Sequence, residues 1–325
     1  MIFFICSFLI CLILPIVLEK PLSMSRLSTN KEKPMLLGIS VYAVVLTAAL
    51  VLLNSRQKDA SFLMDMVWGA SALFFVGLID DIRNLSVAGK LTGQIAAACI
   101  AVFFGIRTSI VFIPEWMNVV LSLFWIVALI NAFNFLDIMD GLCPGISFII
   151  CATFLFLSSF SGALILCVFF CALAGATLAA LAYNRPPARF YLGDSGSMLL
   201  GYIFACCALK IHYAVDISQR LALLVPLLIM SLPIFDLVFT VCVRKIKHIP
   251  VFKKSADHLV LLLMCKGYSQ FKVLAIMYSL CLASGLSAIL LQCLPPGIKP
   301  WVLSCFVLAI FVFTFICVKV TRAHA

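Results

Sequence analysis

The sequence predicts an all-α, polytopic membrane protein with about 10–11 transmembrane helices. Of its 325 residues, 65% are hydrophobic and only 11% are charged, whereas soluble domains are about half apolar and about a quarter charged. Apolar runs of about 20 residues, the length that crosses a bilayer, recur along the whole chain. Because no polar stretch is long enough for a soluble domain, we expect residues 1–325 to form a single integral membrane domain.

Eleven apolar segments are candidates for membrane-spanning helices. In chain order they lie near residues 1–18, 35–53, 62–79, 92–106, 117–135, 146–160, 162–183, 198–213, 221–243, 272–293 and 301–318. The fourth and eighth segments are short, which leaves the number of spans open by about one. The 15 cysteines lie mostly within these runs without CxxC spacing, so we expect neither disulfides nor a zinc site.

The lysine and arginine residues are distributed unevenly between the two sides of the predicted bundle. With the N-terminus outside, 17 of the 23 fall in the cytoplasmic connections or the C-terminal tail. This asymmetry follows the positive-inside rule and predicts the orientation of a multi-pass protein in its membrane. The net charge of +10 is therefore a topology signal and does not predict nucleic-acid binding.

The acidic residues gather on the same predicted side. Nine of the 13 map to cytoplasmic connections or to the helix ends that border them, and ionisable groups at membrane depth are costly and usually functional. Asp80 and Asp81 stand together at the inner end of the third segment, with Lys90 downstream. Adjacent carboxylates repel unless a cation or a shared proton relieves them, and Mg²⁺ prefers oxygen ligands. The alternative for this pair is an ordinary solvated helix end.

A second polar group recurs at every third position, at Asn131, Asn134, Asp137 and Asp140. Steps of three keep all four residues on one slowly drifting stripe of a helix, and Gly141 then lets the helix end or bend. Since the intervening residues are apolar, the pattern favours a functional strip over a polar seam between packed helices.

The third polar group is the Gly-Asp-Ser-Gly segment at residues 193–196, which contains Asp194. Two prolines end the preceding apolar segment, and Arg185 and Arg189 add positive charge. Glycines let the backbone approach a ligand, and amides that open a helix favour phosphate oxygens, although this motif by itself also suits a surface turn. Carboxylates, basic side chains and glycine turns together are typical of phosphoryl-transfer sites, and the membrane setting indicates a lipid reactant.

These three segments, in this order, resemble the polyprenyl-phosphate N-acetylhexosamine-1-phosphate transferase family (glycosyltransferase family 4), particularly its bacterial undecaprenyl-phosphate N-acetylglucosamine-1-phosphate transferases. The resemblance covers most of the chain. It implies transfer of an N-acetylhexosamine-1-phosphate, with N-acetylglucosamine expected, from a UDP-sugar to undecaprenyl phosphate, with release of UMP. This reaction is the first membrane step of cell-envelope polysaccharide synthesis. The resemblance also implies a location in the bacterial cytoplasmic (inner) membrane, a cytoplasm-facing active-site cleft and a requirement for Mg²⁺, with Mn²⁺ as an alternative.

The resemblance implies a role for each residue that matches a family motif. Asp80, Asp81 and Asp137 match catalytic residues, and Asp194 together with Asp81 matches the metal site. The matches to substrate-binding residues are Lys90, Asn131, Asn134, Asp140, Asn184 and His258. A phosphate monoester is already a competent nucleophile, which favours direct attack by the carrier phosphate, while a covalent aspartyl-phosphate route stays open.

Two loops depart from the family pattern. In the first, Arg26, Pro34 and Gly38 keep the spacing, but other residues replace the lysine, the histidine and the first glycine. In the second, His258 is what remains of a histidine-rich motif, which argues against a UDP-muramoyl-pentapeptide donor. Another UDP-N-acetyl sugar and a transporter without transferase activity remain the alternatives, and the sequence leaves a homodimer open.

Overall fold

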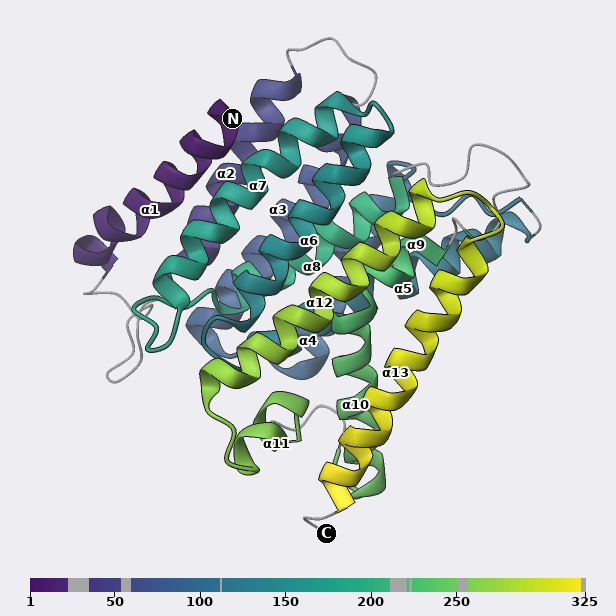
Figure 1. The fold of residues 1–325 in the computed structure, drawn as a ribbon. Helices are drawn as coiled ribbons and strands as arrows, with labels where there is room; N and C mark the ends of the chain where they lie inside the picture. Colours follow the sequence, from purple (N-terminus) through teal and green to yellow (C-terminus); the bar gives the residue numbers. More distant parts are fainter. Residues whose placement is uncertain are drawn as a thin grey trace. The chain divides into compact units, whose positions relative to one another are not determined.

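The computed structural model describes residues 1–22, 35–53, 60–111, 113–210, 221, 224–250 and 257–322, so Arg26 and Pro34 lie outside the described residues. Throughout these ranges the regular elements are helices and none is a strand, which confirms the all-α prediction (Figure 1). The chain divides into two compact units, Met1–Ile211 and His212–Ala325. A single domain over residues 1–325 therefore stays a prediction.

The first unit is a bundle of long helices. In its described part these are α1 (Ile2–Leu22), α2 (Leu37–Leu53), α3 (Ala60–Arg83), α4 (Val87–Phe103), α5 (Glu115–Leu136), α6 (Leu142–Phe160), α7 (Leu164–Asn184) and α8 (Gly193–Lys210). Helix α8 packs against α2, α3 and α5 and is buried along nearly its whole length. Helix α7 packs against α1, α2 and α6. Because α8 lies among three neighbours, its first turn is positioned by all of them.

The second unit is built around α12 (Gln270–Cys293). This helix contacts α9 (Val225–Ile229), α10 (Ser231–Ile246), α11 (Leu259–Cys265) and α13 (Lys299–Arg322). The predicted ninth segment, 221–243, is interrupted at Met230, between α9 and α10. The reason is Pro233, which has no N–H to donate and whose ring would clash with the carbonyl of Ile229 in a continuous helix. In the first turn of α10 the same proline is tolerated.

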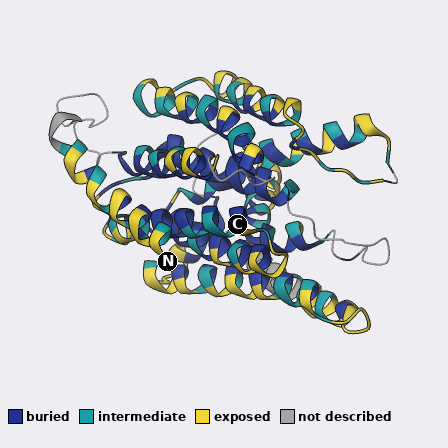
Figure 2. Ribbon diagram, turned by 90° about the horizontal axis from the view of Figure 1, so that it is seen from above, coloured by how far each residue is buried: buried dark blue, intermediate teal, exposed yellow. Residues whose placement is uncertain are grey.

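Each of the eleven predicted segments falls on one or more helices. Among the described residues, six helices are long and apolar enough to cross a membrane, namely α1, α3, α5, α6, α7 and α12, while α2, α4 and the first part of α13 are shorter apolar helices. Figure 2 shows helices with buried residues on one side and exposed residues on the other. The exposed side chains include large apolar ones such as Trp68, Phe75 and Phe124. Faces of this kind suit contact with lipid, so the protein is a multi-pass membrane protein.

Helix α5 ends earlier than the sequence pattern predicts. Asn131 and Asn134 lie on it, but the helix stops at Leu136, Asp137 is its C-cap residue, and Asp140 lies in the turn that follows. The expectation of one helical stripe with four polar residues is therefore wrong for its last two members. Contacts from the 184–190 segment fix this turn, as described below, and these contacts are invisible to periodicity.

Candidate active site

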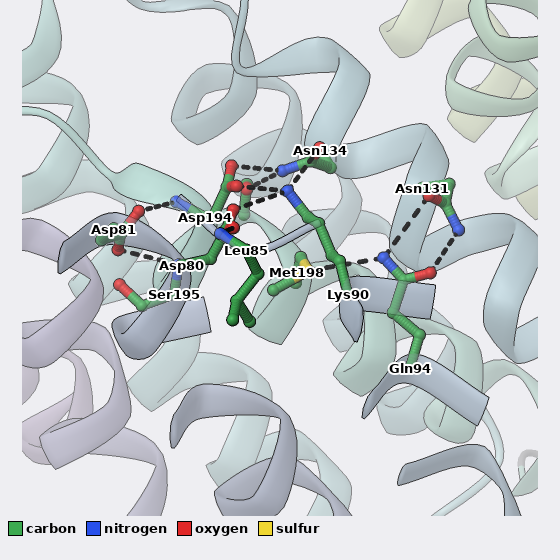
Figure 3. Close-up of polar contacts among 11 residues, drawn as sticks. Asp80, Asp81, Leu85, Lys90, Gln94, Asn131, Asn134, Asp194, Ser195 and Met198 are labelled. Carbon is green, nitrogen blue, oxygen red and sulfur yellow. Dashed lines mark hydrogen bonds and ion pairs between the residues drawn. The ribbon is translucent and has the colours of Figure 1, made fainter. Parts of the chain in front are cut away.

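Polar side chains from the ends of four helices meet in the first unit (Figure 3). Asp80 comes from the last turn of α3, Lys90 from the first turn of α4, Asn134 from the last turn of α5, and Asp194 from the first turn of α8. The Lys90 ammonium donates to Asp80 Oδ2 at 3.2 Å and to Asn134 Oδ1 at 3.4 Å, and it forms an ion pair with Asp194 Oδ2. The three polar groups found in the sequence thus converge on one ammonium group.

Asp194 is held from two sides. Its Oδ2 contacts Lys90, while Asn134 Nδ2 donates to its Oδ1 at 2.6 Å and to Ser197 Oγ at 3.2 Å. The side chains of Asp80, Lys90 and Asp194 are 12%, 20% and 30% exposed. Because these side chains are partly buried, solvent screens their charges less than it would at a fully exposed site, and the carboxylates still remain open to a polar ligand.

The two adjacent aspartates point to different partners. Asp81 Oδ1 accepts a hydrogen bond from the Asp194 amide at 2.7 Å, and its Oδ2 accepts one from the Ser195 amide at 3.1 Å. A carboxylate in this position satisfies free N–H groups at the N-terminus of α8 and interacts favourably with the helix dipole. Asp80, by contrast, accepts the Leu85 amide on Oδ1 at 2.6 Å and Lys90 on Oδ2. Separate partners relieve the repulsion between the neighbouring carboxylates.

Glycines allow α8 to begin at this place. Gly193 has φ of +72°, a conformation that L side chains rarely adopt, and a Cβ there would lie 2.7 Å from Asp81 Oδ2. A Cβ on Gly77 in α3 would lie 2.5 Å from Ser195 Cα, and one on Gly38 in α2 would lie 2.6 Å from Ser195 Oγ. Both helices therefore approach the first turn of α8 more closely than any larger residue would permit. Sequence reasoning missed Gly77, although a glycine three residues before the aspartate pair was the available signal.

The turn after α5 and the loop before α8 are tied together. Asn184, only 1% exposed, accepts the Gly141 amide on Oδ1 at 2.8 Å and donates to the Phe190 carbonyl at 3.1 Å. Asp140 Oδ2 accepts the Ala188 amide at 3.0 Å. Two residues that the resemblance assigned to substrate binding thus form hydrogen bonds that hold the loop leading to Asp194.

Asp137 lies in the same turn, close to the other carboxylates, and its side chain is only partly exposed. Desolvation, followed by the charges of Asp194, Asp81 and Asp140, raises the pKa of Asp137 well above its usual value. A cation added near such a carboxyl group would favour its ionised form.

Asn131 forms hydrogen bonds with Gln94, a residue that the sequence reasoning missed. Its Nδ2 donates to Gln94 Oε1 at 2.7 Å and to the Val127 carbonyl at 2.8 Å, and its Oδ1 accepts from Gln94 Nε2 at 3.4 Å (Figure 3). Gln94 follows Lys90 by four residues on α4, so helical spacing was the signal that could have identified it.

His258 belongs to the second unit, at the N-cap position of α11. Its Nδ1 lies 3.6 Å from Asp236 Oδ2, and its Nε2 lies 3.3 Å from an Arg244 nitrogen; all three residues are buried. Asp257 pairs with Lys247 at 2.7 Å beside it. His258 is therefore part of a buried polar cluster in its own unit, and its assignment to substrate binding stays a prediction.

The metal site implied by the resemblance can be compared with the oxygen atoms present. Among the described residues, no group of three or more His, Cys, Asp or Glu side chains is arranged to hold a metal ion. However, oxygens of Asp80, Asn134 and Asp194 surround the Lys90 ammonium. These are carboxylate and amide oxygens, the ligand type that Mg²⁺ prefers, and they already attract a cation. The donor set therefore fits Mg²⁺ in its chemistry.

Comparison with known proteins gives a family match and many relatives. The model of glycosyl transferase family 4 matches residues 63–212, the region that contains Asp80, Asp81, Asp137 and Asp194 but not His258. The chain is 27% identical to the "Probable undecaprenyl-phosphate N-acetylglucosaminyl 1-phosphate transferase" of Bacillus subtilis (strain 168), covering 81% of this chain and 74% of that relative.

Two further relatives carry different enzyme names. The "Decaprenyl-phosphate N-acetylglucosaminephosphotransferase" of Mycobacterium tuberculosis (strain ATCC 25618 / H37Rv) is 32% identical, over 75% of this chain and 67% of that one. The "Phospho-N-acetylmuramoyl-pentapeptide-transferase" of Staphylococcus aureus (strain MW2) is 29% identical, over 75% and 80%. The relatives thus share a phospho-sugar in their names but differ in the sugar.

Proposed function

Because the chain belongs to glycosyl transferase family 4, we propose that it transfers N-acetylglucosamine-1-phosphate from a UDP-sugar to undecaprenyl phosphate and releases UMP. As a member of this family it is a phospho-sugar transferase in the membrane. The observation that carries the proposal is the convergence of Lys90, Asp80, Asn134 and Asp194 from four helix ends. A cation flanked by carboxylate and amide oxygens suits the positioning of phosphate groups, which is most of what phosphoryl transfer requires.

In the proposed reaction, an oxygen of the carrier phosphate attacks the β-phosphorus of the UDP-sugar. A new phosphorus–oxygen bond joins the two phosphates, while the bond from that phosphorus to the bridging oxygen breaks and UMP leaves. Lys90 neutralises phosphate charge as the two anionic reactants approach each other. Asp80 and Asn134 hold its ammonium group in place, and Asp81 fixes the first turn of α8, which carries Asp194.

Magnesium is the proposed cofactor, with Mn²⁺ as an alternative. Asp194 and Asn134 would hold it, since their side-chain oxygens face the ammonium of Lys90 and remain partly open. A bound Mg²⁺ would supply charge neutralisation at the diphosphate. Asp81 is also predicted as a metal ligand, but each of its oxygens already accepts a hydrogen bond from a backbone amide of α8. These contacts favour a role in holding the first turn of α8.

Direct attack by the carrier phosphate is the favoured route. The oxygens of Asp80 and Asp81 already accept hydrogen bonds from Leu85, Lys90, Asp194 and Ser195, which reduces their nucleophilicity. Asp137, the third aspartate that the resemblance marks as catalytic, also accepts a backbone hydrogen bond, from Gly193, and it is the residue we assign to a covalent aspartyl-phosphate route. The two routes differ in one observable, because the covalent route releases UMP from the UDP-sugar before any carrier is added.

The cytoplasmic side of the bacterial inner membrane is the proposed location of the site. Asp80, Lys90, Asn134 and Asp194 lie at helix ends rather than at mid-helix, and the basic residues of the sequence favour that side. Acidic residues at helix ends also argue against the transporter alternative, because transporters bind their ligands near the bilayer midplane. The product would enter cell-envelope polysaccharide synthesis.

The test is an assay of the purified protein in detergent with Mg²⁺ and undecaprenyl phosphate. The donor panel contains UDP-N-acetylglucosamine, UDP-N-acetylgalactosamine and UDP-N-acetylmuramoyl-pentapeptide, and both UMP and lipid-linked sugar are measured. We expect turnover with UDP-N-acetylglucosamine, its loss in Asp194→Asn, and wild-type rates in the control Thr92→Val, whose exposed side chain donates to the Ala88 carbonyl. Absence of turnover with every donor, from folded protein, would refute the proposal.

A further inference from the structure

A pair of side-chain amides lies about one helical turn from the candidate site, on two of the helices that carry its residues. Gln94 of α4 and Asn131 of α5 exchange hydrogen bonds in both directions, at 2.7 and 3.4 Å. Gln94 Nε2 also donates to Met198 Sδ of α8 at 3.5 Å, and Gln94 is only 1% exposed (Figure 3). We call Gln94, Asn131 and Met198 the amide layer.

Each residue of the amide layer lies about one helical turn from a residue of the site. Gln94 follows Lys90 by four residues on α4, Asn131 precedes Asn134 by three residues on α5, and Met198 follows Asp194 by four residues on α8. Residues three or four apart on a helix lie on the same face, one above the other. Each member of the amide layer therefore lies directly next to one of the three residues that meet in the site.

The geometry makes the amide pair a constraint on the relative positions of these helices. Both hydrogens of the Asn131 amide are used, by Gln94 and by the Val127 carbonyl, and Gln94 uses its own amide toward Asn131 and Met198. In an apolar interior, amides that lose their partners are costly, so α4 cannot slide or rotate against α5 without breaking this pair. A movement of that kind would also shift Lys90 relative to Asn134.

We propose that Gln94 is a positioning residue of the transferase. Through its hydrogen bonds to Asn131 and Met198, it fixes α4 relative to α5 and α8, so that the Lys90 ammonium reaches Asn134 and Asp194. This inference rests on the proposed function and adds a residue to which neither the sequence motifs nor the resemblance assigned a role. Asn131 acts in it as the partner of Gln94. A merely structural role would lower stability without changing the turnover of folded protein or the environment of Lys90.

The kinetic test compares Gln94→Leu, Gln94→Asn, Asn131→Gln and the double swap Gln94→Asn/Asn131→Gln. The swap transfers one methylene across the pair and so retains both amides and their combined length. We expect kcat to fall by up to about 100-fold in each single variant, as for a displacement of about 1 Å, with KM for the UDP-sugar nearly unchanged. The swap should recover most of the loss, and failure to exceed either single variant would count against the proposal.

A second measurement does not depend on the reaction. Acetylation of Lys90 by acetic anhydride is measured by mass spectrometry relative to the exposed Lys266. In the wild type the ion pairs of Lys90 slow its acetylation, and Gln94→Leu should raise the relative rate several-fold because the ammonium is released. Thr92→Val, on the same helix, loses only a hydrogen bond to the Ala88 carbonyl and should leave the rate unchanged.

The two measurements separate the two claims. If the wild type turns over no donor, the proposed function fails, and Lys90 acetylation still decides the role of Gln94. If the wild type is active and folded Gln94→Leu keeps both wild-type kcat and wild-type acetylation, the positioning role is overturned while the transferase stands.

Discussion

Replacement of Gly77 by alanine tests whether the close contact between α3 and α8 positions the site. An added Cβ would lie 2.5 Å from Ser195 Cα, 2.7 Å from the Ser195 nitrogen and 2.9 Å from the Asp194 carbonyl carbon. Ordinary carbon–carbon contacts lie at about 3.5–4.0 Å. All three obstructing atoms belong to the backbone, so no side-chain rotation can relieve the clash, and α3 and α8 must separate by about 1 Å.

The separation acts directly on the residues of the site. Asp81 is four residues from Gly77 on α3, and its hydrogen bonds to the Asp194 and Ser195 amides, 2.7 and 3.1 Å long, span the same contact. A shift of about 1 Å breaks or lengthens them and moves Asp194 relative to Lys90. We expect kcat to fall by about 100-fold, the size expected for a 1 Å misplacement, and stability to fall by about 1–3 kcal/mol from overpacking.

The assay measures UMP release at saturating substrates, together with thermal unfolding, for Gly77→Ala and a control glycine. Gly89→Ala in α4 is the control, because the nearest atom to its added Cβ is Ser86 Oγ at 3.4 Å. Alanine is the better helix former, so the control should be as stable as the wild type or more stable. Wild-type kcat in folded Gly77→Ala would show that the contact does not position the site.

Four further predictions concern two side chains of the site, its metal and its reaction route. In Asp81→Asn the side chain keeps one acceptor for two amides, so we expect a loss of about 0.5–2 kcal/mol in unfolding free energy together with lower kcat; unchanged thermal unfolding would contradict the capping role. Lys90→Met should reduce kcat far more than it raises KM, because the ammonium that stabilises phosphate charge is lost; steady-state kinetics at saturating metal measure this. Removal of divalent ions with EDTA should abolish turnover and Mg²⁺ should restore it, whereas full activity in EDTA would exclude a metal role for Asp194. With UDP-N-acetylglucosamine and Mg²⁺ but no carrier, direct attack predicts no UMP, and a stoichiometric burst would instead support a covalent intermediate on Asp137.

Sequence reasoning identified the residues of the site better than their contacts. Asp80, Lys90, Asn134 and Asp194 were all singled out from sequence, and they meet in space. Their individual partners could not be predicted, because spacing along one helix does not say which neighbouring helix a side chain faces. The adjacent aspartates show this most clearly, since Asp81 caps α8 and Asp80 binds Lys90.

The error in the α5 stripe has the same origin. A repeat of three residues is compatible with a helix through Asp140, but Asn184 and Asp140 bond to backbone groups of the other segment and hold residues 137–141 as a turn. These partners lie more than 40 residues apart in sequence, so local periodicity carries no information about them.

The sequence by itself determined the class of the protein, because apolar runs long enough to span a bilayer and an uneven distribution of basic residues are properties of the chain before it folds. It also indicated which polar residues have a function, because placing ionisable groups at membrane depth costs free energy. Only the tertiary structure decided that Gly77 admits α8 beside α3, that Gln94 bonds to Asn131, and that Lys90 is the cation shared by Asp80 and Asp194. Those outcomes depend on distances between helices, which are set by packing across the bundle and not by the order of residues within any one helix.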